Sequence, residues 1–133
     1  MIEPQKIVAA ISPQRLFIYG KPKVGKTSAV AQLPNHLIID TEVKGNNGDQ
    51  LVGGTSYCEG ATSVVVDGLP KLKECLSYLQ EKPGTHDFIV LDTIDHIEAW
   101  VGEAVCRAHS VKHIGDIPHG KGWSLMRNQV IAI

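Results

Sequence analysis

The stretch GKPKVGKTS covers nine consecutive residues: Gly20, Lys21, Pro22, Lys23, Val24, Gly25, Lys26, Thr27 and Ser28. Its first eight residues fit the pattern G-x-x-x-x-G-K-[ST] without a mismatch. Glycines let the main chain curl so tightly that its N–H groups converge on phosphate oxygens. Lys26 is expected to reach the β- and γ-phosphates, and the hydroxyl of Thr27 to coordinate Mg²⁺. The stretch therefore predicts a P-loop that binds a nucleotide.

The segments on either side of the loop predict a strand and a helix. Arg15–Tyr19 is a short apolar run with aromatic and β-branched residues that ends at a glycine, which is typical of a buried strand. After Lys26, the run TSAVAQL predicts a short helix that stops before Pro34 and points its positive dipole end at the phosphates. This context is the one that a P-loop requires.

Apolar runs and helical repeats alternate along the rest of the chain. Further strands are predicted at His36–Asp40, at Ser63–Val66 and at Phe88–Leu91, the last of which is closed by Asp92. Apolar residues at helical spacing predict two helices, one with Leu69, Leu72, Leu76 and Leu79 and one with Ile94, Ile97, Val101 and Val105. This alternation implies an α/β fold, a parallel sheet with crossover helices.

Length and composition limit the classes of protein. The 133 residues suit one domain, so 1–133 is read as a single P-loop nucleotide-binding domain, and a net charge of −1 argues against a strongly basic DNA-coating protein. No run approaches the roughly 20 apolar residues of a membrane helix and no secretory signal is recognisable, so a cytoplasmic protein without membrane contact is expected. The apolar ending Val130–Ile133 suggests truncation within a longer core, although a natural C-terminal helix can also end in this way.

The segment Val43–Ala61 is rich in Gly, Asn, Ser and Thr and has little periodicity. It predicts a long surface loop, and loops of this length often have a function.

Two carboxylates follow predicted strands. Asp92 ends an apolar strand, so it is expected at the carboxyl edge of the sheet, where it would hold Mg²⁺ opposite Thr27; capping of the next helix is the alternative. The residue after Asp92 is Thr93, so a base that activates water must come from elsewhere. Glu42 is the candidate because it follows the strand that ends at Asp40. An ordinary exposed glutamate is the other interpretation.

The order YGKPKVGKTS, LIIDTE and FIVLDT resembles RecA-type ATPases, in which a strand-end D-x-E supplies the catalytic glutamate. The IIDTE and IPHGKGW segments more narrowly resemble phage-encoded RecA-like ATPases associated with single-strand annealing recombination. The resemblance implies ATP as the nucleotide, Lys26 and Glu42 as catalytic residues, single-stranded DNA as a partner, and a homo-oligomer in which a neighbouring subunit supplies an arginine finger. The N-K-x-D signature of GTPases is absent from the sequence, which also favours ATP.

Two weaker patterns lie further along the chain. Cys106, His109 and His113 have a spacing that would align zinc ligands on a helix, although a polar helix end explains them as well. Between Arg107 and Arg127 there are four Lys or Arg and three His against one acid, together with Trp123. This neighbourhood could contact single-stranded nucleic acid, whereas Trp123 in the core with a solvated charged face is the commoner arrangement.

Three functions fit these observations. The leading one is an ATP-hydrolysing RecA-like motor or recombination factor. The second is a nucleotide-binding switch or scaffold module with little turnover. The third, a P-loop kinase, ranks last because no arginine-rich lid follows in the second half of the chain.

Overall fold

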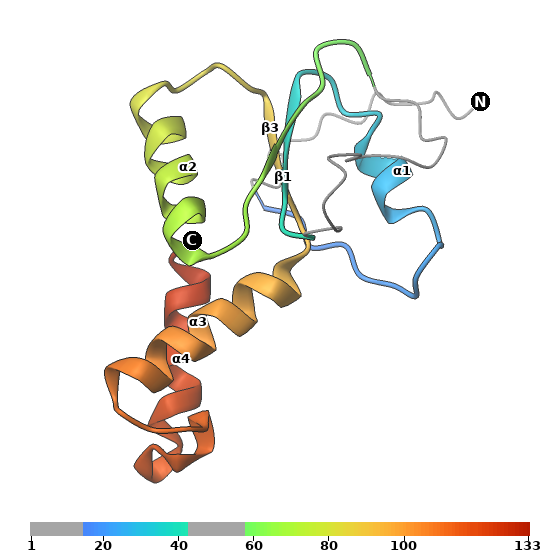
Figure 1. The fold of residues 1–133 in the computed structure, drawn as a ribbon. Coiled ribbons are helices and arrows are strands. Elements are labelled where there is room, and N and C mark those ends of the chain that lie inside the picture. The colour runs from blue at the N-terminus through green and yellow to red at the C-terminus, as the bar shows by residue number, and fades with distance from the viewer. Residues whose placement is uncertain (1–14, 43–57) are drawn as a thin grey trace, which may run out of the picture.

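A computed structural model describes residues 15–42 and 58–133 of this chain. They form a three-stranded parallel sheet with helices on both faces (Figure 1). The central strand is β1 (His36–Asp40), with β2 (Thr62–Val65) on one side and β3 (Phe88–Asp92) on the other. The predicted α/β architecture is therefore confirmed.

Alternate side chains of β1 point to opposite faces of the sheet, and both faces are covered. Leu37 and Ile39 belong to the main core, which they form with α2 (Leu69–Glu81) and α3 (Ile94–Ala108). Burial of one such aliphatic side chain contributes about 1.5–3 kcal/mol, so this face is where the sheet gains most of its stability. The leucines and isoleucines that predicted α2 and α3 from helical spacing form the buried sides of these helices.

The opposite face of the sheet carries α1 (Lys26–Val30), as Figure 1 shows. Ile38 and Ala31 are fully buried on this side. The helix is shorter than the predicted run TSAVAQL, because the chain closes with a tight turn in which the Leu33 N–H donates to the Val30 carbonyl ahead of Pro34. The P-loop is thus attached to the sheet through only one short helical turn.

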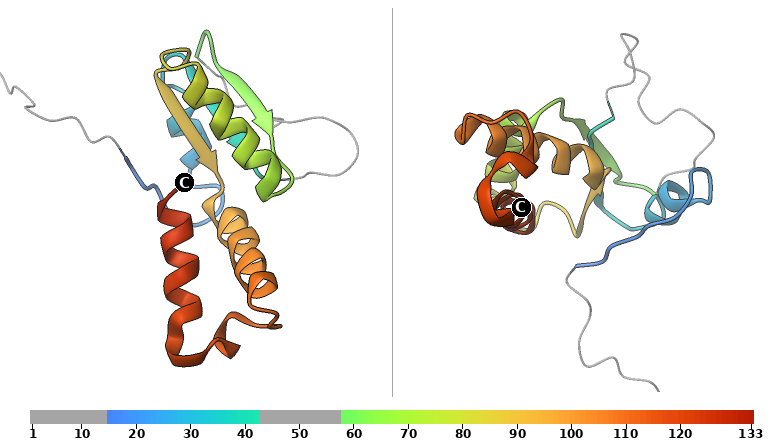
Figure 2. Two further views of the ribbon diagram at one scale, coloured as in Figure 1. Left: turned by 90° about the vertical axis from the view of Figure 1, so that its left-hand side faces the viewer. Right: turned by 90° about the horizontal axis from the view of Figure 1, so that it is seen from below.

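Helices α3 and α4 (Lys121–Ile131) form a hairpin that extends beyond the carboxyl end of the sheet (Figure 2). Two short 3₁₀ turns connect them, η1 (Ile114–Asp116) and η2 (Pro118–Gly120). Glycine is required at Gly122, because a Cβ there would lie 2.3 Å from the carbonyl oxygen of Ile114. We call the end of this hairpin, residues 106–127, the distal lobe.

The predicted first strand is wrong. Arg15–Tyr19 forms neither a strand nor a helix in the structure, and Tyr19 is 84% exposed. A strand needs a neighbour for its backbone N–H and C=O groups, and an apolar run shows that a segment favours burial without specifying that neighbour. Phe17 and Tyr19 instead stack on each other, with ring centroids 6.0 Å apart.

The predicted surface loop Val43–Ala61 lies largely outside the described residues. No helix in the described ranges is long and apolar enough to cross a membrane.

Candidate functional site

The P-loop runs in a tight curve from Gly20 to the start of α1. Lys23 and Gly25 have positive φ angles of 64° and 96°. Gly25 directly precedes the helix, and a side chain at this φ would be strained even though the space around it is open. The glycine in the motif therefore has a local conformational reason.

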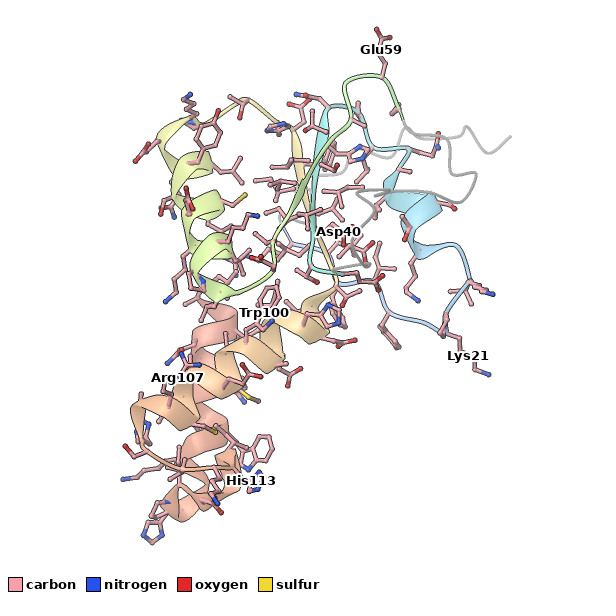
Figure 3. The ribbon with its side chains drawn as sticks, in the orientation of Figure 1. Lys21, Asp40, Glu59, Trp100, Arg107 and His113 are labelled. Atoms are coloured by element: carbon pink, nitrogen blue, oxygen red, sulfur yellow. The ribbon has the colours of Figure 1, made fainter. Side chains whose placement is uncertain are left out.

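The amino group of Lys26 lies within this curve. Its Nζ donates to the carbonyl oxygens of Gly20 at 2.7 Å and of Lys21 at 2.8 Å. The positive charge is thereby held where the loop closes, while the side chain of Lys21 points away from the sheet (Figure 3). The contact of Lys26 with the phosphates stays a prediction.

Thr27 and Asp92 come together, although they are far apart in the sequence. The Thr27 hydroxyl donates to the Asp92 carboxylate, with 3.4 Å between Oγ1 and Oδ2. Thr27 lies in the first turn of α1 and Asp92 is the last residue of β3, so the contact joins the P-loop to the carboxyl edge of the sheet. This is the pairing that the sequence predicts.

Asp92 is in an environment that disfavours its charged form. Partial burial raises the pKa of its carboxyl group above the ordinary value, and the nearby Glu42 carboxylate raises it further. Asp40 adds to the effect, whereas the Thr27 hydroxyl and the Lys26 ammonium oppose it. The edge of the sheet therefore carries an excess of negative charge that a cation would relieve.

Asp40 and Glu42 lie at the same edge as Asp92. Asp40 pairs with Asp92 in the register of β1 and β3, and Figure 3 shows Asp40 at the end of the sheet opposite Glu59. The Asp40 carboxylate accepts the backbone N–H of Glu42 at 2.8 Å, which holds Glu42 at the strand end. The predicted acidic residues are thus brought into one neighbourhood by two adjacent strands.

This neighbourhood fits Mg²⁺. The Thr27 hydroxyl and the Asp92 carboxylate are oxygen donors, which Mg²⁺ prefers, and Mg²⁺ is commonly held by one or two protein oxygens together with phosphates and water. Among residues 15–42 and 58–133, no three His, Cys, Asp or Glu residues are grouped to hold a metal. The zinc hypothesis at Cys106, His109 and His113 therefore has no support, and His109 Nδ1 instead lies 3.1 Å from the carbonyl oxygen of Val105.

Sequence reasoning missed one polar cluster at this edge. Thr41, between Asp40 and Glu42, is buried and contacts the backbone of Thr93 through its hydroxyl. His96 Nδ1 lies 3.0 Å from the carbonyl oxygen of Thr41. The only signal in the sequence is the alternation along the strand: Leu37 and Ile39 point to the same face, and Thr41 is a polar residue at the next position of that series.

The distal lobe has a basic, aromatic surface. Trp123 is 56% exposed, so the expectation that it lies in the core is wrong. An open hollow of about 420 Å³ lies at residues 103–114, and its lining includes Arg107, Lys112 and His113 together with Glu103 and Cys106. Figure 3 shows Arg107 and His113 in this lobe, away from the P-loop. The lobe thus combines basic side chains with an accessible aromatic ring.

A model of the AAA domain family matches residues 12–133. No curated protein and no solved structure gives a match. The chain belongs to the AAA domain family, and it is a P-loop NTPase whose family membership implies nucleotide binding. The narrower resemblance to phage recombination ATPases stays a prediction.

Proposed function

We propose that this member of the AAA domain family binds ATP and hydrolyses it with the help of Mg²⁺. The observation that carries the proposal is the contact between Thr27 and Asp92, with Glu42 close enough to raise the pKa of Asp92. Hydrolysis needs a group that holds the phosphates, a metal site and a residue that orients water. The residues that we propose for these three roles, Lys26, Thr27 with Asp92, and Glu42, lie near one end of the sheet, which supports the proposal.

The residues divide this work by their chemistry. The backbone of Gly20–Ser28 and the ammonium of Lys26 would hold the phosphates, and Thr27 with Asp92 would hold Mg²⁺. When bound, Mg²⁺ would neutralise charge on the phosphate oxygens. Glu42 would accept a hydrogen bond from the attacking water, because its carboxylate belongs to the same edge of the sheet.

We further propose that the protein acts on single-stranded DNA, in keeping with the resemblance to recombination ATPases. Four Lys or Arg side chains and the exposed Trp123 in the distal lobe support this role, since single-strand binders combine basic side chains that follow the phosphates with aromatic rings that stack on bases. In keeping with the same resemblance, we propose that a second copy in a homo-oligomer supplies an arginine to the phosphates; Arg107 itself lies in the distal lobe, away from the P-loop.

The test is Mg-ATP turnover by the purified protein and by Glu42→Gln. We expect the variant to bind ATP as the wild type does and to lose at least about 100-fold in turnover, because general-base catalysis contributes on the order of 10²–10⁴-fold. Glu59→Gln is the matched control, since Glu59 is an exposed glutamate at the opposite end of the sheet. Equal turnover in Glu42→Gln and Glu59→Gln would remove Glu42 from the mechanism.

The same assay with single-stranded DNA tests the partner. We expect DNA to stimulate turnover in the wild type and in Tyr78→Ala, which removes an exposed aromatic ring on α2, but much less in Trp123→Ala. If ATP binds but the wild type shows no turnover with or without DNA, the protein is a nucleotide-binding switch or scaffold instead.

A further inference from the structure

The side chain of Thr41 is unusual among the polar groups near the P-loop, because it is only 2% exposed and yet lies between two carboxylates of the site, Asp40 and Glu42. A buried hydroxyl is costly unless it is hydrogen-bonded. The hydrogen-bond partners of Thr41 therefore indicate which segments its side chain connects.

Those partners continue the pairing of β1 with β3 beyond the last residues of the strands. The register ends at Asp40 opposite Asp92, and the Thr41 N–H then donates to the Asp92 carbonyl at 2.8 Å. One step further, the Thr41 hydroxyl takes the place of a backbone partner. It accepts the N–H of Thr93 at 2.9 Å and donates to the Thr93 carbonyl at 3.0 Å.

His96, in the first turns of α3, adds a third connection. Its Nδ1 lies 3.0 Å from the carbonyl oxygen of Thr41 and 3.2 Å from the Thr41 hydroxyl. The Thr41 hydroxyl has a single proton, which it donates to the Thr93 carbonyl. The contacts of His96 with Thr41 are therefore hydrogen bonds when Nδ1 is the protonated nitrogen of the imidazole and donates to Thr41. The imidazole also stacks on Trp100, with centroids 6.5 Å apart.

We propose that Thr41 is a positioning residue that holds Glu42 in place relative to Asp92. The inference rests on the proposed hydrolysis of ATP. Glu42 follows Thr41 directly, and its own N–H is held by the Asp40 carboxylate. The two strand ends that carry Glu42 and Asp92 are thereby tied together by a side chain, at the point where backbone pairing alone would let them separate.

Thr41→Val tests the proposal, because valine keeps the shape of threonine and removes the hydroxyl. We expect ATP affinity to stay within about threefold of the wild type, since the P-loop is untouched, and kcat to fall by about 10- to 100-fold, the scale of a small misplacement of a reacting group. Thr41→Ser keeps the hydroxyl and should restore most of kcat. Thr62→Val is the matched control, as Thr62 is an exposed threonine that starts β2 at the other end of the sheet.

A double variant separates positioning from general stabilisation. If Thr41 acts through Glu42, then Thr41→Val should cause no further loss of single-turnover rate in a Glu42→Gln background, because the group that it positions is already inactive. An additional loss of the full size would overturn the proposal, as would wild-type kcat in Thr41→Val. Absence of turnover in the wild type would instead overturn the proposed function, which makes the two failures distinguishable.

A second variant is needed if Thr41→Val does not fold. Should Thr41→Val melt below the assay temperature, Thr41→Cys retains a group of similar size with only a weak hydrogen-bonding capacity. A reduced kcat at unchanged ATP affinity in Thr41→Cys supports the positioning role, and a wild-type kcat contradicts it.

Discussion

The P-loop and the carboxyl edge of the sheet are adjacent, yet they are built in opposite ways. The contacts of Lys26 reach only five and six residues back along the chain, to Lys21 and Gly20. The contacts at the edge join residues that are far apart, since Thr93 comes 52 residues after Thr41 and Asp92 comes 65 residues after Thr27. A phosphate-binding loop can thus be encoded in one short segment, whereas a site for metal and water needs several elements to meet.

The two regions also differ in how far their apolar side chains are buried. The segment before the P-loop exposes its large apolar side chains, while β1 is buried on both faces. We therefore expect the sheet to carry stability and the P-loop to carry ligand binding.

The largest expected effect concerns stability. Ile39→Ala, at a residue with no exposed surface, should lower the free energy of unfolding by about 2–5 kcal/mol, because it leaves a cavity in the core. The same change at Ile18, which is 43% exposed in the segment before the P-loop, should cost less than about 1 kcal/mol. Urea denaturation of both variants measures the difference. Equal losses would mean that residues 15–20 are packed as firmly as β1.

A smaller effect, on binding, should come from the P-loop. Lys26→Ala removes a charged donor to the phosphates and should weaken ATP binding by about 100-fold, since such hydrogen bonds contribute about 1.5–3 kcal/mol. The melting temperature without nucleotide should hardly change, because the partners of Lys26 are carbonyls of its own exposed loop. Titration with a fluorescent ATP analogue measures the affinity, and Lys71→Ala, an exposed lysine on α2, is the control. Unchanged affinity in Lys26→Ala would refute the assignment of the loop.

The smallest expected effect is a gain in stability, from Asp92→Asn. Because burial and Glu42 raise the pKa of Asp92 in the folded protein, folding favours its protonated form, and the charged form costs stability once the pH is above that pKa. Asp92→Asn removes this cost. In EDTA at neutral pH the variant should melt about 1–3 °C higher than the wild type, a modest value because solvent screens a half-buried carboxylate.

The pH dependence supplies the check on this sign. As the pH falls below the ordinary aspartate value of 3.8, Asp92 becomes protonated in both the folded and the unfolded wild type, so the advantage of the variant should disappear. Asp87→Asn is the matched control, since Asp87 is an exposed aspartate just before the opposite end of β3. A variant that melts well below the wild type at neutral pH would show instead that the Asp92 carboxylate stabilises the fold.

Much of the fold could be predicted from local patterns. The strands His36–Asp40 and Phe88–Asp92 are recognisable as short apolar runs, although only the first of them is buried. Helix α3 is recognisable because apolar residues recur at helical spacing. Arg15–Tyr19 has the same kind of apolar run and forms no strand. Strand formation requires a partner in space, which the composition of a segment does not identify.

The site shows the same division. A strand-end aspartate and a D-x-E segment were recognisable, because the carboxyl ends of parallel strands share one edge. The role of Thr41 was hidden, since an isolated threonine in a sequence gives no sign of the backbone groups that it will contact 52 residues later. The exposure of Trp123 was equally hidden, because it depends on how the start of α4 packs against η1.

By itself, the sequence determined the P-loop, because a tight curve of glycines with a lysine at its end is formed by neighbouring residues through local backbone geometry. It also determined the alternation of strands and helices, since the spacing of apolar residues sets which face of each element is buried. The tertiary structure alone decided that Thr41 ties β1 to β3 through Thr93. Those contacts depend on the register between strands, which only the packing of the whole sheet establishes.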